Sequence, residues 1–250
     1  MNTYTRPADI ENESMRIISA ELKEQGIEIP EKYGAVVKRV IHATADFEFA
    51  RTLTFVCGKI PESAGQTGDS AQTEELRWVV ETEGQTDPVS AAENAFLHGT
   101  TIITDTNMAL SGISKPSLQK LGCEAFCFMA DQRIAAAAKE NGTTRAVAAM
   151  EYAAERYPGA VFAVGNAPTA LFKLSELMDR GLRPALVIAV PVGFVNVVEG
   201  KEEIIRTCRK YEIPAIAARG RKGGSTVAAA ILNALLYEAA GMLAPASRGW

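Results

Sequence analysis

Histidine is scarce in this sequence, and its cysteines lack the spacing that metal sites need. The only histidines are His42 and His98, and the four cysteines include no Cys-x-x-Cys pair. Structural zinc sites use four cysteine or histidine ligands, usually in closely spaced pairs. We therefore expect no metal site, and we expect the cysteines to be buried, reduced thiols of an intracellular protein.

Long apolar runs and an excess of basic residues are also missing. The most apolar stretch, residues 184–198, is interrupted by Pro191, Gly193 and Asn196, whereas a membrane span needs about 20 continuous apolar residues. Lysine and arginine number 26 against 30 acidic residues, which gives a net charge of -4. The polar first 16 residues fit neither a signal peptide nor a transit peptide. We expect a cytoplasmic protein that binds neither membranes nor nucleic acid.

The 250 residues, 47% of them hydrophobic, suffice for one substantial core, so we expect a single domain over residues 1–250. From about residue 100 to 240, β-rich apolar runs alternate with helical patterns, which is typical of repeated β-α units. This pattern predicts a three-layer, doubly wound α/β fold, with a largely parallel sheet covered by helices on both faces. The five expected strands are Thr101–Thr104, Glu124–Met129, Ala160–Val164, Ala185–Val190 and Ala215–Ala218.

The N-terminal part, about residues 7–57, has helical spacing, and a polar loop is expected at about residues 61–74. Several of the later helical patterns are followed by glycine, which tolerates a left-handed cap. These glycines are Gly142, Gly159, Gly181 and Gly241. The expected later helices are Gln132–Asn141, Arg145–Tyr157, Thr169–Arg180, Lys201–Tyr211 and Ser225–Ala240.

The residues that follow the strands are the first place to look for a site, because ligands bind beyond the carboxyl ends of the strands in open α/β sheets. Residues 219–226 combine three cations with the start of the last helix, which suits an anion. The phosphate-loop order G-x-x-x-x-G-K-[ST] and the pattern G-x-G-x-x-G are both absent, so nucleotide binding is disfavoured. A tight glycine turn with solvated cations is the alternative interpretation.

The two histidines favour different roles. If the helix continues past His42, Asp46 lies one turn later on the same face, where a carboxylate would favour the imidazolium. His98 precedes Gly99 at the end of a probable helix, where an imidazole commonly bonds the terminal carbonyls. We therefore expect a structural role for His98 and consider His42 a candidate for proton transfer.

Five ordered motifs, together with the segment Ser14–Arg16, resemble the precorrin-8X methylmutase family, which includes the cobalt-precorrin-8 methylmutases. The resemblance runs from about Tyr4 to Leu236. The motifs are Val40–Asp46, Asp105–Gly112, Gly165–Phe172, Pro191–Val195 and Arg219–Ser225.

The resemblance implies an isomerase of cobalamin biosynthesis. Such an enzyme moves a methyl group from C-11 to C-12 of precorrin-8 or its cobalt form, giving hydrogenobyrinate or cobyrinate. It needs no cofactor and works as a homodimer. The resemblance also implies that His42 is catalytic. The expected substrate-binding residues are Ser14, Met15, Arg16, Thr44, Asp105, Asn107, Met108, Gly165, Asn166, Thr169, Gly193, Phe194, Arg219, Gly220, Arg221, Gly223, Gly224 and Ser225.

A non-catalytic corrinoid carrier is the main alternative function, because the same arginines and glycines would hold a product without converting it. The complete motif around His42 favours catalysis. The sequence leaves open whether the substrate contains cobalt.

Overall fold

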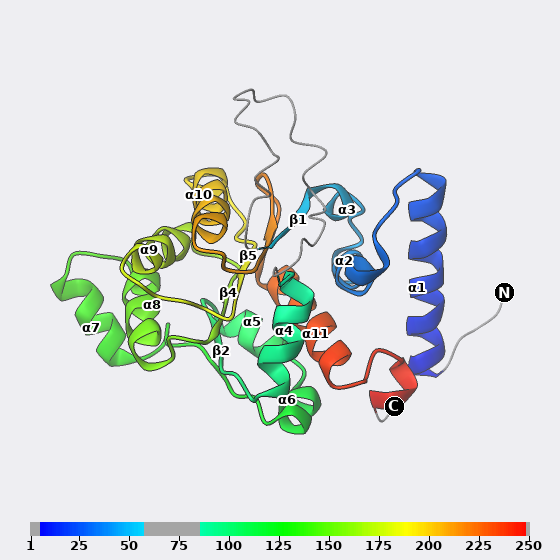
Figure 1. The fold of residues 1–250 in the computed structure, drawn as a ribbon, viewed down its shortest axis with the longest axis horizontal. Coiled ribbons are helices and arrows are strands. Elements are labelled where there is room, and N and C mark those ends of the chain that lie inside the picture. The colour runs from blue at the N-terminus through cyan, green and yellow to red at the C-terminus, as the bar shows by residue number, and fades with distance from the viewer. Residues whose placement is uncertain (1–5, 58–85, 249–250) are drawn as a thin grey trace.

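A computed structural model of the chain describes residues 6–57 and 86–248. Its centre is a six-stranded sheet with the strand order β1-β6-β5-β4-β2-β3 (Figure 1). Neighbouring strands run parallel, except that β1 pairs with β6 in antiparallel orientation. The strands are β1 (Leu53–Val56), β2 (Ile102–Thr104), β3 (Ala125–Phe126), β4 (Val161–Val164), β5 (Leu186–Ala189) and β6 (Ala215–Ala218).

The predicted largely parallel sheet is confirmed, but the predicted number of five strands is wrong. Each expected strand contains an observed one, and the sixth strand, β1, lies in the part of the chain that we predicted to be helical. Its four residues, including the polar Thr54, are all buried, and β1 pairs with β6 from the far end of the sequence. The predicted polar loop at about residues 61–74 lies outside the described residues.

Eleven α-helices and a short 3-10 helix surround the sheet in the described residues. The predicted helices are present, although α10 begins before the predicted Lys201 and the short helices α5 and α6 were not predicted. The helices are α1 (Pro7–Glu24), α2 (Glu31–Thr44), α3 (Phe49–Thr52), α4 (Pro88–Leu97), α5 (Asn107–Gly112), α6 (Lys115–Leu121), α7 (Gln132–Glu140), α8 (Arg145–Arg156), α9 (Pro168–Asp179), α10 (Val197–Lys210), α11 (Ser225–Ala239) and η1 (Pro245–Arg248).

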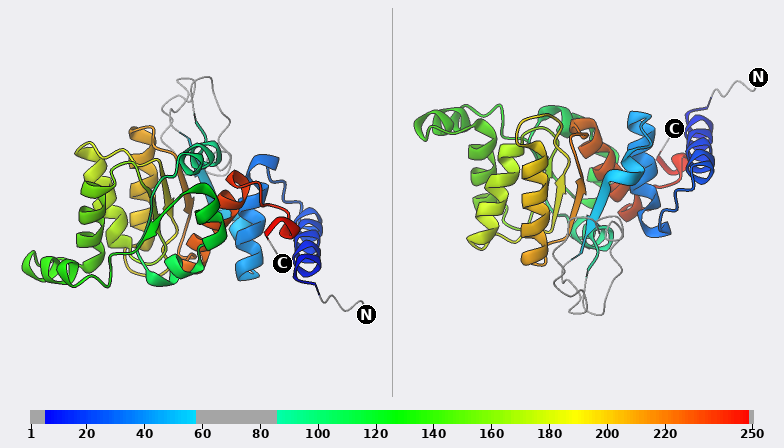
Figure 2. Two further views of the ribbon diagram at one scale, coloured as in Figure 1. Left: turned by 90° about the horizontal axis from the view of Figure 1, so that it is seen from below. Right: turned by 90° about the horizontal axis from the view of Figure 1, so that it is seen from above.

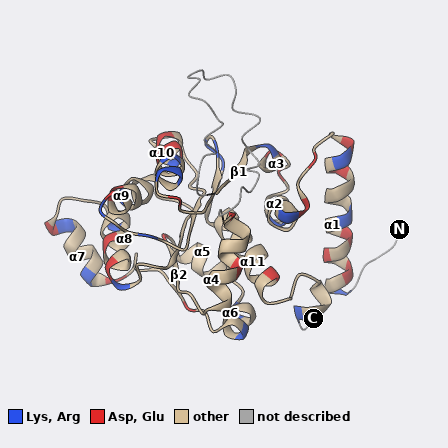
Figure 3. Ribbon diagram, viewed as in Figure 1, with Lys and Arg blue, Asp and Glu red and all other residues tan. Residues whose placement is uncertain are grey.

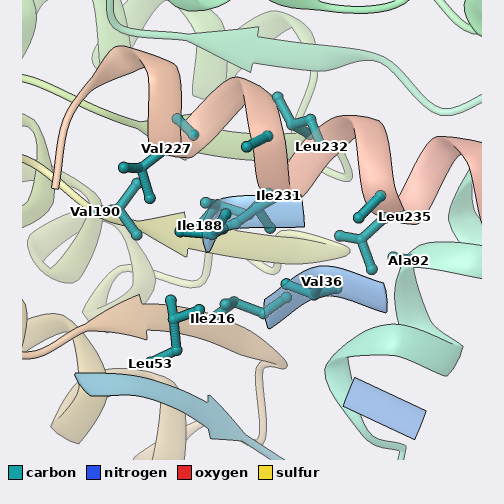
Figure 4. Packing of buried hydrophobic residues seen from close by; sticks show 14 of the residues in the cluster. Val36, Leu53, Ala92, Ile188, Val190, Ile216, Val227, Ile231, Leu232 and Leu235 are labelled. Atoms are coloured by element: carbon teal, nitrogen blue, oxygen red, sulfur yellow. The ribbon is translucent and has the colours of Figure 1, made fainter. Parts of the chain in front are cut away.

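Helices lie on both faces of the sheet, with α2, α4 and α11 on one side and α8, α9 and α10 on the other (Figure 2). Successive strand residues point to opposite faces. On β5, Ile188 belongs to the hydrophobic cluster under α2 and α11, and Val187 belongs to the cluster under α8 to α10. Figure 4 shows Ile188 beside Ile231 of α11, with Val36 of α2 nearby. Burial on both faces explains why β4, β5 and β6 consist of apolar residues only.

Helix α1 adds a further layer outside α2. It packs on α2 and on η1 at the other end of the chain, so the N-terminal and C-terminal segments lie together (Figure 1). The carboxylate of Glu11 in α1 accepts hydrogen bonds from Arg39 of α2 at 2.5 Å and from Arg248 of η1 at 2.6 Å. The guanidinium groups of Arg39 and Arg248 also both lie over the ring of Tyr237 in α11.

Most of the predicted glycine caps are present. Gly142, Gly181 and Gly241 follow α7, α9 and α11 with φ of 60°, 108° and 62°. The prediction for Gly159 is wrong: it is not among the glycines with positive φ, because α8 has already ended at Arg156. Pro158 explains the earlier end, since a residue before proline is pushed out of helical conformation.

Cys123, Cys127 and Cys208 are free thiols, as expected. Cys57, Cys123 and Cys208 are buried, and Cys127 is partly buried. Burial raises the pKa of the Cys208 thiol to about 12. This thiol is therefore unreactive at neutral pH.

Charged residues of both signs are interspersed on the helices (Figure 3). α1, α8 and α10 each carry lysine or arginine together with aspartate or glutamate. Among the described helices, none is both long enough and apolar enough to cross a membrane.

Candidate active site

The order of the strands changes direction between β2 and β4. β2 pairs with β3 on one side and with β4 on the other, although β3 precedes β4 in the chain. The connections from β2 and β4 therefore diverge at their carboxyl ends, and in open α/β sheets ligands bind at such a switch point. Asp105 follows β2 there, and Gly165 follows β4.

Asp105 joins the two diverging loops. Its Oδ1 accepts the N–H of Gly165 at 2.8 Å, and its Oδ2 accepts the N–H groups of Asn166 at 2.8 Å and Ala167 at 2.7 Å. Burial raises the pKa of this carboxyl, and the three N–H donors oppose that effect. Both oxygens are directed at the protein's own main chain. Contact of Asp105 with substrate stays a prediction, whereas its positioning role is visible in the structure.

The start of α11 is held against the same two loops. The hydroxyl oxygens of Ser225 and Thr106 lie 2.7 Å apart, and Thr106 also accepts the N–H of Ala109 at 3.1 Å. A Cβ at Gly165 would lie 2.8 Å from the Cα of Ser225. Glycine at this position therefore allows β4 and α11 to meet at backbone contact.

The segment Arg219–Gly224, which we call the basic loop, leads from β6 into α11. A Cβ at Gly223 would lie 2.2 Å from the carbonyl oxygen of Val190, and the N–H of Gly224 donates to that same oxygen at 2.8 Å. Because the obstacle is backbone, a larger residue at 223 requires the loop to move. The predicted binding residues Gly223 and Gly224 thus fix the loop against the end of β5.

Two cations of the basic loop are tied to neighbouring elements. Arg219 Nε donates to the hydroxyl of Thr54 at 3.2 Å, and Arg219 Nη1 lies 3.3 Å from Glu202. Lys222 Nζ lies 2.6 Å from Asp46, just beyond the end of α2. The hydrogen bond connects the basic loop to β1, and the two ion pairs connect it to α10 and to the end of α2.

Arg221 is exposed, and its guanidinium lies over an aromatic ring. The Arg221 Cζ is 5.5 Å from the centre of the Phe194 ring, and the N–H of Gly193 donates to the Arg221 carbonyl at 3.3 Å. Phe194 is 83% exposed, Val195 76% and Met108 69%. Exposed apolar side chains that lie together, as at the neighbouring Phe194 and Val195, commonly mark a binding surface. The structure thus brings together the predicted site residues Gly193, Phe194 and Arg221.

Lys201 was missed by the sequence analysis, although it supports the basic loop from inside. It is fully buried, and its Nζ donates to the carbonyl oxygens of Gly220 at 2.9 Å and Lys222 at 2.7 Å. Burial lowers the pKa of Lys201 to about 8. Lys201 is four residues after Val197 and three before Ile204, which places it on the apolar face of α10. This spacing could have predicted from the sequence that Lys201 is buried.

His42 lies in the last turn of α2 and is exposed. The predicted pairing with Asp46 is wrong, because α2 ends two residues before Asp46 and this carboxylate pairs with Lys222 instead. The pKa of His42 lies below its ordinary value, mainly through desolvation and then through the charges of Arg39 and Arg248. Glu11 opposes these effects. The neutral imidazole therefore predominates at neutral pH.

The predicted residues on α1 are not brought to this edge of the sheet. The hydroxyl of Ser14 donates to the carbonyl of Ile10 at 2.8 Å, and Arg16 pairs with Glu13 at 2.6 Å. Met15 packs against the hydrophobic cluster under α2. Since α1 lies outside α2 (Figure 1), these residues are separated from the strand-end loops within one chain.

Of the other predicted site residues, two lie at the carboxyl edge of the sheet and two lie on helices. Asn107 and Asn166 are exposed at the ends of β2 and β4. The Thr44 hydroxyl donates to the carbonyl of Val40 at 2.8 Å within α2. The Thr169 hydroxyl lies 3.2 Å from that of Thr144. The two threonine hydroxyls therefore serve local bonds in this structure.

His98 has the predicted structural role. Its Nδ1 lies 2.7 Å from the carbonyl oxygen of Asn94 at the end of α4. The imidazole thus bonds one of the terminal carbonyls that a helix leaves without an intrahelical donor.

Comparison with known proteins gives one consistent family. The sequence profile described as Precorrin-8X methylmutase matches residues 9–72 and 70–238. A cobalt-precorrin-8 methylmutase of Salmonella typhimurium is 38% identical over 242 residues, covering 95% of this chain and 98% of the relative. A precorrin-8X methylmutase of Sinorhizobium is 41% identical over 150 residues, covering 60% and 70%. The crystal structure of a precorrin-8X methylmutase from Thermus thermophilus has a TM-score of 0.71 at 35% identity, covering 93% and 98%.

We predict that Gly223→Ala destabilises the protein, because the new Cβ meets the Val190 and Pro191 carbonyl oxygens at 2.2 and 2.7 Å. The free energy of unfolding in urea should fall by about 1–3 kcal/mol, as for overpacked sites. Gly159→Ala is the matched control, since nothing lies within 4 Å of its Cβ. Equal unfolding curves for the two variants would contradict the close packing of the basic loop.

The buried Lys201 predicts an alkaline rise in stability relative to Lys201→Met. Between a folded pKa of about 8 and the ordinary pKa of about 10.4, the unfolded chain holds a proton that the folded chain has released. Raising the pH through this window therefore favours the folded state. Between pH 8 and 9.5 the stability of the wild type should gain up to about 2 kcal/mol on the variant in urea denaturation. A difference that stays constant or shrinks would refute the depressed pKa.

Proposed function

This chain belongs to the precorrin-8X methylmutase family, and we propose that it moves a methyl group from C-11 to C-12 of precorrin-8 or cobalt-precorrin-8. The protein is thus an isomerase of cobalamin biosynthesis. The observation that carries this proposal is the match to named methylmutases along nearly the whole chain. The position of the methyl shift follows the family resemblance.

The site suits a large conjugated ring that bears carboxylates. Phe194, Val195 and Met108 offer exposed apolar surface at the carboxyl edge of the sheet, and Arg221 lies over the Phe194 ring. A guanidinium presents a rigid fork of donors to a carboxylate. We propose that the ring contacts the apolar groups while Arg219 and Arg221 bind its carboxylates.

His42 is the proposed catalytic residue. The reaction breaks the bond from the methyl group to C-11 and forms one to C-12 within the same molecule, so it needs no oxidant and no external methyl donor. We propose that the imidazolium of His42 protonates the macrocycle, or stabilises its protonated form, while the methyl group moves. Its exposure leaves the imidazole accessible to a ligand.

A corrinoid carrier remains the alternative function, and it is favoured by the same surface of arginine and phenylalanine. It requires affinity for the product without turnover. Following turnover in the wild type distinguishes the two functions directly. Any cobalt would arrive already chelated by the ring, so it belongs to the substrate. We also propose a cytoplasmic homodimer, as the resemblance implies.

We predict that His42→Ala lowers kcat by about 10²- to 10⁴-fold, the usual contribution of a general acid or base. Purified protein would be incubated anaerobically with precorrin-8 and, separately, with cobalt-precorrin-8. Turnover would be followed by the visible spectrum, and the product identified by NMR.

His98→Ala is the matched control for this experiment, since His98 bonds only its own helix end among the described contacts. It should retain near wild-type kcat. Undiminished turnover by His42→Ala would remove His42 from catalysis. Tight product binding by a wild type that converts neither substrate would favour the carrier.

We predict that Arg221→Met weakens substrate binding by about tenfold or more, because a charge-assisted hydrogen bond contributes roughly 1.5–3 kcal/mol. Arg219→Met should act in the same direction, but it also breaks the contacts with Thr54 and Glu202. The methyl shift leaves the carboxylates of the ring unchanged, so the affinity for the product, measured by fluorescence quenching or calorimetry, tests the same contact.

Arg206→Met controls for the loss of an arginine at the surface, since Arg206 lies exposed on α10 and pairs with Glu203. Its affinity should equal that of the wild type. An affinity of Arg221→Met equal to this control would exclude Arg221 from the binding site.

A further inference from the structure

Lys201 directs its ammonium group into the backbone of the basic loop. Its donors reach the carbonyl oxygens of Gly220 at 2.9 Å and Lys222 at 2.7 Å. These two residues flank Arg221, so one side chain holds the peptide unit before the arginine and the peptide unit that follows Lys222. The carbonyl of Arg221 itself accepts the N–H of Gly193 at 3.3 Å. The backbone of Arg221 is therefore restrained by three hydrogen bonds while its side chain stays exposed.

Protein stability does not account for a lysine at this position. Removing an ammonium from water is costly, and the acceptors here are neutral carbonyls rather than a carboxylate. Both carbonyls belong to a loop whose residues Gly220 and Lys222 are exposed and partly exposed. Replacing a buried charge by an apolar side chain is often neutral or stabilising. What the side chain visibly does is restrain one loop.

The ammonium is held by packing rather than by the loop. Lys201 stands on the buried face of α10 between Val197 and Ile204, which are 2% and 0% exposed. A Cβ at the preceding Gly200 would lie 3.3 Å from the carbonyl oxygen of Pro168, so α10 approaches α9 closely at this turn. The helix therefore supplies a fixed point against which the basic loop is positioned.

A second tether holds the loop from the opposite side. The Lys222 ammonium pairs with Asp46 at 2.6 Å and with Glu48 at 2.5 Å. This tether acts on a side chain, whereas Lys201 acts on the backbone beside Arg221. Loss of Lys201 should therefore free the carbonyl groups of Gly220 and Lys222 and leave the loop attached through the Lys222 side chain.

We propose that Lys201 is a positioning residue for substrate binding, which holds the carbonyl groups of the residues before and after Arg221 so that its guanidinium is oriented before the ligand arrives. This inference rests on the proposed function, in which Arg221 binds a substrate carboxylate. Lys201 itself touches no substrate. Its loss lowers the fraction of molecules with Arg221 in the binding-competent position.

The test is Lys201→Met, which removes the donors and keeps an unbranched side chain. If about one molecule in ten retains the competent loop, the apparent KM for the substrate rises about tenfold. The kcat should change by less than about threefold, because the interaction is lost equally from the ground state and the transition state. Amide hydrogen exchange in residues 219–224 should accelerate, whereas exchange in β5 and β6 should not.

A double-mutant cycle separates positioning from a general structural effect. Once Arg221→Met has removed the guanidinium, adding Lys201→Met should raise KM by less than about twofold, since the two effects share one contact with the substrate. A merely structural role would add its full tenfold effect in both backgrounds. Full additivity would overturn the proposal.

Lys173→Met is the matched control, because Lys173 is another largely buried lysine but pairs with Glu151 and Glu176 on the far side of α9. It should leave KM unchanged. Lys201→Gln is a second variant, for the case that Lys201→Met fails to fold. It keeps two N–H donors without the charge, so its KM should lie between those of the wild type and the methionine variant. A wild-type KM in folded Lys201→Met or Lys201→Gln overturns the role of Lys201. Absence of turnover in the wild type instead overturns the proposed function.

Discussion

The carboxylate of Asp105 is the interaction on which the geometry of the candidate site depends. It is buried at the point where the strand order reverses, and there it accepts three main-chain N–H groups from residues 165–167. Burial of a carboxylate is costly, and the three donors offset that cost. Because the loop after β4 is held in this way, Gly165 lies against Ser225, and α11 begins within hydrogen-bond distance of Thr106. One carboxylate thus sets the relative positions of β2, β4 and α11.

The other half of the edge is built differently, from main-chain contacts and one buried ammonium. The basic loop meets the end of β5 through Gly223 and Gly224, where no side chain intervenes. Lys201, on the buried face of α10, donates hydrogen bonds to two carbonyl groups of the same loop. Both halves leave their apolar and cationic side chains exposed while restraining the backbone. Such preorganisation lowers the entropy that must be lost when a ligand binds.

The sequence predicted the parts of the fold that depend on local pattern. The five strands from residue 100 onward and their helices follow from hydrophobic periodicity. β1 was missed because its four buried residues form a strand only by pairing with β6, which is a tertiary effect. Asp46 was misplaced because α2 ends with Ala45 in the left-handed conformation, at φ 53°, which is uncommon outside glycine. Lys201 was missed because lysine is almost never fully buried.

The separation of Asp46 from His42 changes how the proposed chemistry must work. Asp46 is committed to Lys222, and the charges that act most strongly on His42 are two arginines and one glutamate. The free enzyme therefore holds a largely neutral imidazole at neutral pH. A proton donor must be protonated, so an opposite charge has to be supplied from elsewhere. A substrate that carries several carboxylates brings this charge with it. Under the proposed function, binding of the ring raises the pKa of His42, and the imidazole becomes protonated. The proton donor therefore forms only when the substrate is bound.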